Sequence, residues 1–267
     1  MPIQLSQISE DPLYHGHVWT VGDEDKLAHI VAVLLLGRRR HAEAILEGKT
    51  MGDILASDAM VDALVGKLKV PSGDNPQRWH RDGWLFQMIS WIAADASLAS
   101  AADLIAPPQP RAADKGLDGL LILAHDGVDH ARLVICEDKA STDPRGTFRD
   151  DVCPELLDFE ADRRNNEIAA ALDALLDAVE DATAANQIID RLVWQEKKSY
   201  RVSMVVGDDH STPSGRKKLF KNYDSTVPGP LLRRRAETIH LSDMRAWFET
   251  FAQRVIEHLD SFRPADV

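Results

Sequence analysis

The sequence contains only two cysteines, Cys136 and Cys153, among its 267 residues. Two cysteines do not suggest a disulfide framework, and Cys136 lies inside an apolar stretch that we expect to be a core strand. The first residues also lack the basic segment followed by an apolar segment that marks a signal peptide. These absences predict a protein of the reducing cytoplasm.

Long hydrophobic runs are missing as well. The longest apolar run, residues 30–36, is far shorter than the roughly 20 residues that a membrane-spanning helix needs. We therefore expect no membrane association. With 44% hydrophobic and 28% charged residues, the chain has the composition of a globular protein. Its length suits one large domain, or a domain with an appendage.

An excess of positive charge is absent, because 43 acidic residues outnumber 31 Lys and Arg and give a net charge of −12. This argues against a general nucleic-acid coat protein, whose affinity comes largely from neutralising phosphates. It does not exclude an enzyme with a local basic groove, since steering depends on the local field. The sequence also shows no internal repeat, P-loop, G-x-S-x-G motif, H-E-x-x-H pair or zinc-type Cys/His spacing.

The most informative stretch is residues 115–141. It contains two apolar runs, residues 117–124 and 131–136, which are rich in Leu, Ile and Val and short enough to be strands. Between them lies the sequence H-D-G-V-D-H, whose Asp126-Gly127 pair is typical of a hairpin turn. The pattern predicts an antiparallel β-hairpin.

The length of the turn decides which residues of this hairpin face each other. If a four-residue loop spans residues 126–129, the numbers of paired residues sum to 255, and Asp118 lies directly opposite Glu137. A two-residue turn at the Asp-Gly pair gives a sum of 253 and places Asp118 opposite Ile135 instead. A slip of one residue would send the two carboxylates to opposite faces of the sheet.

With the four-residue loop, the hairpin gathers Asp118, Glu137 and Lys139 at one end, since residues two apart in a strand share a face. Two such carboxylates repel each other unless a cation lies between them, and Mg²⁺ or Mn²⁺ takes oxygen ligands of this kind. The lysine would orient or deprotonate a metal-bound water or stabilise developing negative charge. The pattern thus predicts metal-assisted phosphodiester hydrolysis. The alternatives are an ordinary turn at Asp118 and a solvated Glu-Lys pair at a strand end.

Asp118, Glu137 and Lys139 together resemble the D…(D/E)-x-K motif of the PD-(D/E)xK nuclease superfamily, which has the restriction-endonuclease-like fold. The sequence G-W-L-F-Q at residues 83–87 is similar to the G-x-x-F-E/Q opening of the first core helix in Mrr-like and antiphage-effector branches. The resemblance spans residues 82–206. It implies that Gln87 assists the metal site, with an amide where many relatives have a glutamate.

The same resemblance implies an α/β fold with a restriction-endonuclease-like core: a small mixed β-sheet flanked by helices, with an N-terminal helical region. It implies Mg²⁺- or Mn²⁺-dependent cleavage of DNA, as in antiphage effectors such as the nuclease subunit of Hachiman-type defence systems. Because the chain has no helicase motif, an ATP-driven step would need a helicase or similar partner protein. The alternative function is a non-catalytic interaction or regulatory subunit on the same scaffold.

A cluster of helix breakers at residues 71–76, P-S-G-D-N-P, predicts a boundary between an N-terminal helical region (residues 1–75) and the nuclease core with a C-terminal helix (residues 76–267). We expect residues 1–24 to be irregular or to carry a short strand at 17–21, and Asp23 or Asp25 to cap the first helix. Further strands are expected at 200–206 and 238–241. Helices are expected at 26–36, 43–47, 51–68, 84–98, 155–184 (with an interruption near 165–166), 185–193 and 244–259.

Basic residues that follow the motif are candidates for DNA contacts. Arg145 and Arg149 lie in the polar segment where a substrate strand would approach the metal, although they are equally consistent with ordinary loop arginines. The runs Arg216-Lys217-Lys218 and Arg233-Arg234-Arg235 are the most basic in this acidic chain. We expect them to bind phosphates. The competing interpretation is that they bind the protein's own acidic groups or a partner chain.

Overall fold

The protein is described by a computed structural model over residues 1–109, 116–124, 131–177, 182–195 and 198–264. Within these residues a seven-stranded mixed sheet has the order β1-β2-β7-β6-β5-β4-β3. The strands are β1 (Ile3–Glu10), β2 (Tyr14–Val21), β3 (Leu104–Ile105), β4 (Gly119–Leu123), β5 (Arg132–Lys139), β6 (Ser199–Val206) and β7 (Arg234–His240).

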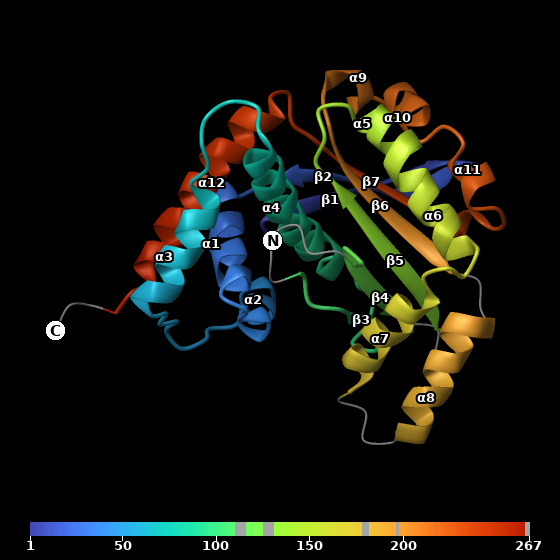
Figure 1. The fold of residues 1–267 in the computed structure, drawn as a ribbon, viewed down its shortest axis with the longest axis horizontal. Helices are drawn as coiled ribbons and strands as arrows, with labels where there is room; N and C mark the ends of the chain where they lie inside the picture. The colour runs from blue at the N-terminus through green and yellow to red at the C-terminus, as the bar shows by residue number, and fades with distance from the viewer. Residues whose placement is uncertain (110–115, 125–130, 178–181, 196–197, 265–267) are drawn as a thin grey trace.

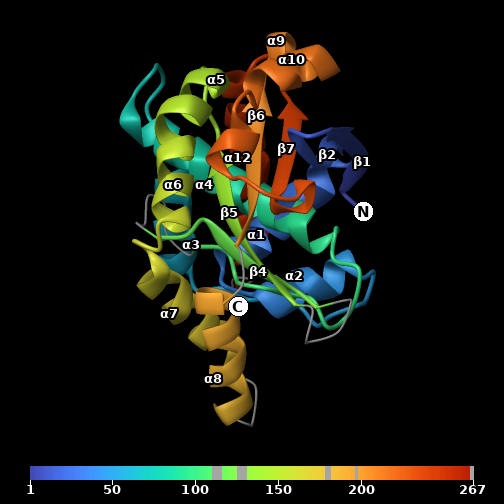
Figure 2. The ribbon, with the colours of Figure 1, turned by 90° about the vertical axis from the view of Figure 1, so that its right-hand side faces the viewer.

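The middle of the sheet is parallel and its edges are antiparallel. Strands β2, β7, β6 and β5 pair in parallel, whereas β1 joins β2, and β4 joins both β5 and β3, in antiparallel fashion. In Figure 2, β5, β6 and β7 run side by side. The Glu-x-Lys sequence therefore lies at the carboxyl end of a parallel strand, where helices leave the sheet and open sites commonly form.

Helices cover both faces of the sheet (Figure 1). Buried side chains divide into two apolar clusters, one for each face. The first face carries α1 (Glu24–Leu35), α2 (Arg39–Leu46), α3 (Asp58–Leu68), α4 (Pro76–Asp95) and α12 (Met244–Ser261). The second carries α5 (Pro144–Thr147), α6 (Cys153–Glu160), α7 (Asn165–Leu176), α10 (Pro213–Leu219) and α11 (Tyr223–Thr226). This confirms the expected α/β class with a mixed sheet and flanking helices.

Two remaining helices lie near the ends of strands. Helix α9 (Asp208–Ser211) follows β6, and α8 (Ala182–Asp190) projects away from the sheet in both views (Figure 1, Figure 2). Short turns of other helix types occur at Phe148–Val152, Arg191–Gln195 and Leu231–Arg233. Within the described ranges, no helix is long and apolar enough to cross a membrane.

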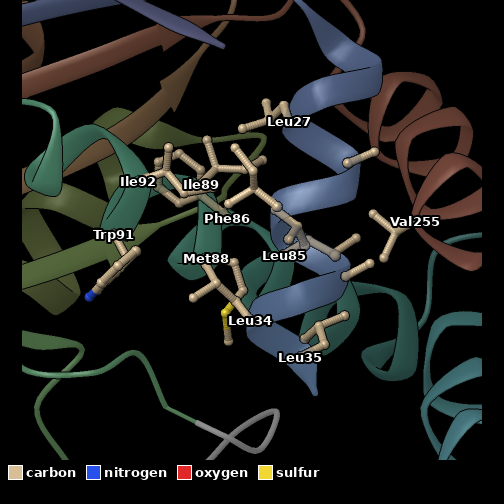
Figure 3. Packing of buried hydrophobic residues seen from close by; sticks show 14 of the residues in the cluster. Leu27, Leu34, Leu35, Leu85, Phe86, Met88, Ile89, Trp91, Ile92 and Val255 are labelled. Atoms are coloured by element: carbon tan, nitrogen blue, oxygen red, sulfur yellow. The ribbon is translucent and has the colours of Figure 1, made fainter. Parts of the chain in front are cut away.

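Helix α4 is the central helix of the first face. Its N-terminus has proline at the first position, and the Asn75 side chain accepts a hydrogen bond from the backbone N–H of Arg78 at 3.0 Å. This strong start explains why the helix begins eight residues earlier than expected. Figure 3 shows Leu85 and Phe86 of α4 packed toward α1, in a cluster that Val255 of α12 also joins. The packing fixes the rotation of α4 and hence the direction of its polar side chains.

The N-terminal segment differs from the expectation. The short strand expected at 17–21 is confirmed as part of β2, whereas the irregular alternative was wrong, because residues 3–21 form the β1–β2 hairpin, and β2 continues the sheet beside β7. Pairing with a distant strand supplies the stability that the weak local pattern did not indicate. The division of the chain near residue 75 stays a prediction, and residues on both sides of it belong to one apolar cluster.

Candidate functional site

The register of the β4–β5 hairpin determines the geometry of the candidate site. Gly119 pairs with Cys136 and Leu120 with Ile135, so the paired numbers sum to 255, as predicted for the four-residue loop. Continuing this register by one residue places Asp118 opposite Glu137. The expected turn itself, residues 126–129, lies outside the described residues.

Three side chains that the motif predicts lie together at this end of the hairpin. The ammonium Nζ of Lys139 is 3.1 Å from Oε2 of Glu137 and 3.7 Å from Oδ2 of Asp118. Alternation along β5 accounts for the arrangement, because Ile135 belongs to the apolar cluster of the second face and Glu137 and Lys139 follow it at intervals of two. The ammonium group of Lys139 thus lies close to both predicted carboxylates.

Gln87 reaches the same site from helix α4. Its Nε2 donates a hydrogen bond to Oδ1 of Asp118 at 2.6 Å, and the backbone N–H of Asp138 donates to Oδ2 at 2.9 Å. Both carboxylate oxygens of Asp118 therefore have a fixed donor. In this structure Gln87 acts as a positioning residue for Asp118.

Burial and mutual repulsion disfavour the charged forms of both carboxylates. The side chain of Glu137 is only 2% exposed, and burial, followed by the charge of Asp118, raises its pKa well above the usual range. Burial also raises the pKa of Asp118, although Lys139 and two hydrogen bonds oppose the rise. A divalent cation between the two groups would remove this cost, because it favours the ionised form of each.

Lys139 is held in its charged form. Burial alone would lower its pKa, but the carboxylates of Glu137, Asp118 and Glu155 outweigh burial and raise the pKa above the usual value. At neutral pH the side chain is therefore an ammonium. In this arrangement it can donate hydrogen bonds and stabilise negative charge, but it is not a free base.

Glu155, in the first turn of α6, is a member of the site that the sequence did not indicate. Its Oε1 lies 3.8 Å from Nζ of Lys139, and its charge and a hydrogen bond with Glu137 contribute to the raised pKa of Glu137. In the sequence, Glu155 is only the first residue of the helix expected at 155–184. No spacing rule connects residue 155 with the motif, since only the packing of α6 on the sheet brings them together.

The chemistry of the donors fits Mg²⁺ or Mn²⁺ better than a metal that needs a complete protein cage. Across the part of the chain that the structure describes, no group of three or more His, Cys, Asp or Glu side chains is arranged to hold a metal ion. Mg²⁺, however, is usually held by one or two carboxylates, with water and phosphate oxygens completing its shell. Asp118 and Glu137 supply that minimal set.

A buried polar network supports the other face of β5. Asp138 accepts a hydrogen bond from the hydroxyl of Ser90 in α4 at 2.5 Å and lies 3.6 Å from Nη1 of Arg201 in β6. Arg201 in turn lies 2.7 Å from Glu237 in β7. Burial raises the pKa of Asp138 to about 6, although Arg201 opposes the rise. The network ties α4 and three strands together beneath Glu137 and Lys139.

The run Arg233–Arg235 does not form a basic surface. All three residues are at most 9% exposed. The expectation that they bind DNA phosphates is corrected, since their guanidinium groups are already engaged inside the protein, as the competing interpretation proposed. The partners are Lys198 O and Glu160 for Arg233, Leu13 O and Pro12 O for Arg234, and Glu237 and Ser97 for Arg235.

Of the second basic run, Arg216-Lys217-Lys218, only the two lysines are exposed. Arg216 is buried and donates to the carbonyl of Ser211, so it too is structural. Lys217 is exposed and forms an ion pair with Glu10 at 2.6 Å, and Lys218 is exposed. That Lys217 and Lys218 bind DNA phosphates stays a prediction.

The two arginines after the motif have different environments. Arg145 donates to the carbonyls of Leu219 and Lys221 at 2.7 and 3.1 Å, so it fastens α5 to the segment around α10. Arg149 is 62% exposed and pairs with its neighbour Asp150. Arg149 can exchange this surface partner for a phosphate at little cost, because exposed ion pairs contribute little stability.

Comparison with known proteins assigns no family. No family model matches the chain, and neither the curated proteins nor the solved structures include a significant match.

Proposed function

We propose that this protein is a metal-dependent nuclease that hydrolyses DNA phosphodiester bonds, on a core of the restriction-endonuclease-like type. The observation that carries the proposal is the convergence of Asp118, Glu137 and Lys139 at one end of the β4–β5 hairpin, with Gln87 bonded to Asp118. The motif of the PD-(D/E)xK superfamily supplies the assignment of roles.

In this proposal Asp118 and Glu137 hold Mg²⁺ or Mn²⁺, which when bound would polarise the phosphoryl oxygen and acidify a water molecule. Gln87 and the Asp138 N–H keep the carboxylate of Asp118 in one orientation. The ammonium of Lys139 orients the attacking water and stabilises the negative charge that develops on phosphate oxygens.

The wider biological role also belongs to the proposal and rests on the resemblance alone. It comprises a place among antiphage effectors in the cytoplasm and, as in Hachiman-type systems, a helicase or other ATP-driven partner protein. Fold and motif do not determine such a role. Co-purification of the tagged chain with its neighbouring gene products tests the partner directly, and the absence of any ATPase among them would remove this part.

The proposal is tested by incubating plasmid, linear duplex and single-stranded DNA with the protein in Mg²⁺, Mn²⁺ or EDTA. Cleavage should require the metal, and Asp118→Asn, Glu137→Gln and Lys139→Ala should each lower the rate at least about 100-fold. Glu257→Gln, on the exposed side of α12, is the matched control and should cleave like the wild type. Equal cleavage rates in all four variants would refute the site.

The alternative is a non-catalytic interaction or regulatory subunit. One observation favours it: Lys139 already neutralises part of the acidic cluster. In that case Asp118 and Glu137 would stabilise the hairpin end as an ion-pair network. No cleavage in either metal, with a lowered melting temperature for Lys139→Ala, would support this function.

A further inference from the structure

A break between helices α6 and α7 brings an arginine to the acidic site. The sequence predicts a long helix at 155–184 with an interruption near 165–166, and the structure places the break just before that point, where Asp162 adopts a left-handed conformation with φ of 59°. Two donors hold its carboxylate: Nζ of Lys198 at 2.5 Å and Nδ2 of Asn165 at 3.1 Å. The chain therefore turns, and Arg164 occupies the position immediately before α7.

The guanidinium of Arg164 is fixed on two sides. Its Nε and Nη2 donate to the two oxygens of Glu167 at 2.9 and 2.7 Å, and its plane lies 4.3 Å from the ring centre of Phe159. The third nitrogen, Nη1, lies 4.0 Å from Oε2 of Glu155, which is too far for a hydrogen bond. Arg164 thus presents one oriented donor toward the cluster formed by Glu155, Glu137 and Lys139.

Arg164 also lines a cavity of about 930 Å³. The residues on both sides of Asp118, Leu117 and Gly119, line the same cavity, so it adjoins the acidic site. The remaining walls are mostly apolar, from residues 106–109 and from Ala171 and its neighbours on α7, with Arg39, Glu167 and Asp177 as charged members. Its volume falls within the roughly 300–1,000 Å³ of small-molecule sites.

We infer that Arg164 binds a phosphate next to the scissile bond and that the cavity accommodates the attached nucleoside, so that the substrate is unpaired nucleic acid. A fixed guanidinium beside metal-binding carboxylates is suited to an anion, and the apolar walls are suited to a base. A base stacked and paired in a duplex cannot enter a cavity without leaving the helix, which requires unstacking and unpairing. This inference rests on the proposed nuclease function and specifies its substrate class.

The test measures binding in EDTA, so that it does not depend on catalysis. Fluorescence anisotropy compares a single-stranded oligonucleotide with the corresponding duplex. The wild type should bind the single strand at least about tenfold more tightly. Arg164→Gln should weaken this binding about tenfold and flatten the slope of log K against log salt by about 0.7, the value for one phosphate on a single strand. Arg164→Lys, which keeps the charge, should restore much of the affinity.

Two further variants separate this role from a structural one. Arg163→Gln is the matched control, because Arg163 is 61% exposed and pairs with Asp158 instead of facing the site; its affinity and salt slope should equal those of the wild type. Ala171→Phe fills the cavity without changing charge and should weaken single-strand binding while leaving the salt slope unchanged.

Equal affinity of the wild type for single strand and duplex would overturn the inference, as would equal salt slopes for Arg164→Gln and Arg163→Gln. If Arg164→Gln unfolds, Glu167→Gln serves instead, because it weakens the hold on the Arg164 guanidinium but keeps the arginine. This variant should weaken single-strand binding. Unchanged affinity would overturn the inference. Arg164-dependent binding without any metal-dependent cleavage would refute the nuclease function alone. Metal-dependent cleavage with Arg164-independent binding would refute this inference alone.

Discussion

The structure predicts that Glu237→Gln destabilises the protein severely at neutral pH. Glu237 is fully buried in β7 and is the common acceptor of Arg201, at 2.7–2.9 Å, and Arg235. Trp19 donates to it at 3.0 Å, and Nδ1 of His17 lies 3.1 Å away. A neutral amide would keep the shape of the side chain but remove the charge that Arg201 and Arg235 share, which leaves Arg201 with Asp138 alone, 3.6 Å away.

Removing one partner of a buried ion pair typically costs about 3–5 kcal/mol, because the remaining charge stays buried. In a chain of this size, each kcal/mol of lost unfolding free energy lowers the melting temperature by about 2–4 °C, so this substitution should lower it by roughly 6–20 °C. That is a large part of the roughly 5–15 kcal/mol that stabilises a typical domain.

The effect should depend on pH in a defined direction. Burial alone would raise the pKa of Glu237, but Arg201 and Arg235 outweigh it and hold the pKa well below the usual value of 4.5. A depressed folded-state pKa contributes stability above the unfolded-state pKa, and that stability is lost as the pH falls through the folded-state value. The difference in unfolding free energy between wild type and Glu237→Gln should therefore be fully present at pH 7 and shrink progressively below about pH 4.5.

Urea unfolding of wild type and Glu237→Gln at pH 7 and at several values between pH 3 and 5 measures this gap. The exposed Glu257→Gln serves as control and should stay within about 0.5 kcal/mol of the wild type at every pH. A Glu237→Gln variant as stable as the wild type at pH 7 would refute the reasoning, as would a gap that widens on acidification.

Three more predictions follow from single contacts. Gln87→Ala should reduce cleavage less than Glu137→Ala and mainly raise the Mg²⁺ requirement, because Gln87 positions Asp118 through one hydrogen bond. A Mg²⁺ titration of the cleavage rate measures this effect. A loss of activity that high Mg²⁺ cannot restore would contradict it. Burial, with a smaller contribution from nearby charges, raises the pKa of Asp95 to about 6, so its contribution to stability is lost as the pH rises through that value. In urea unfolding, Asp95→Asn should therefore be about 1–2 kcal/mol more stable than the wild type at pH 8 and similar to it near pH 4. The gain is smaller than the full pKa shift of Asp95 implies, because the side chain is partly solvated. Phe86→Ala should cost about 3–5 kcal/mol in thermal unfolding, since its fully buried ring packs toward α1 and against Trp19 of β2, and a loss below 1 kcal/mol would show that this core is loosely packed.

Local sequence patterns determined the hairpin and the motif that it carries. The apolar runs on either side of the Asp-Gly pair predicted the β4–β5 pairing, and the four-residue loop gave the register that the structure shows. Because side chains alternate with a period of two, that register also placed Glu137 and Lys139 on one face. The α/β class followed from the same kind of information, since strand and helix periods differ along the chain.

Contacts between distant segments decided what the sequence could not. From the sequence alone, the basic run Arg233–Arg235 was expected to be a surface patch. In the structure it lies at the start of β7, a strand inside the sheet, where carbonyls and carboxylates of other elements surround it. Within residues 3–21 the sequence indicated at most a short strand at 17–21, and the full hairpin forms on the sheet because β7 offers an edge on which β2 can pair.

The same reason explains the site residues that the sequence did not indicate. Glu155 reaches Lys139 because α6 packs on the second face of the sheet, and Arg164 approaches Glu155 because the chain turns at Asp162. Nothing in their spacing from the motif signals this, since the distance between two side chains across separate elements depends on how those elements pack. The sequence determined which groups lie along one hairpin, and the tertiary structure decided which other charges surround them.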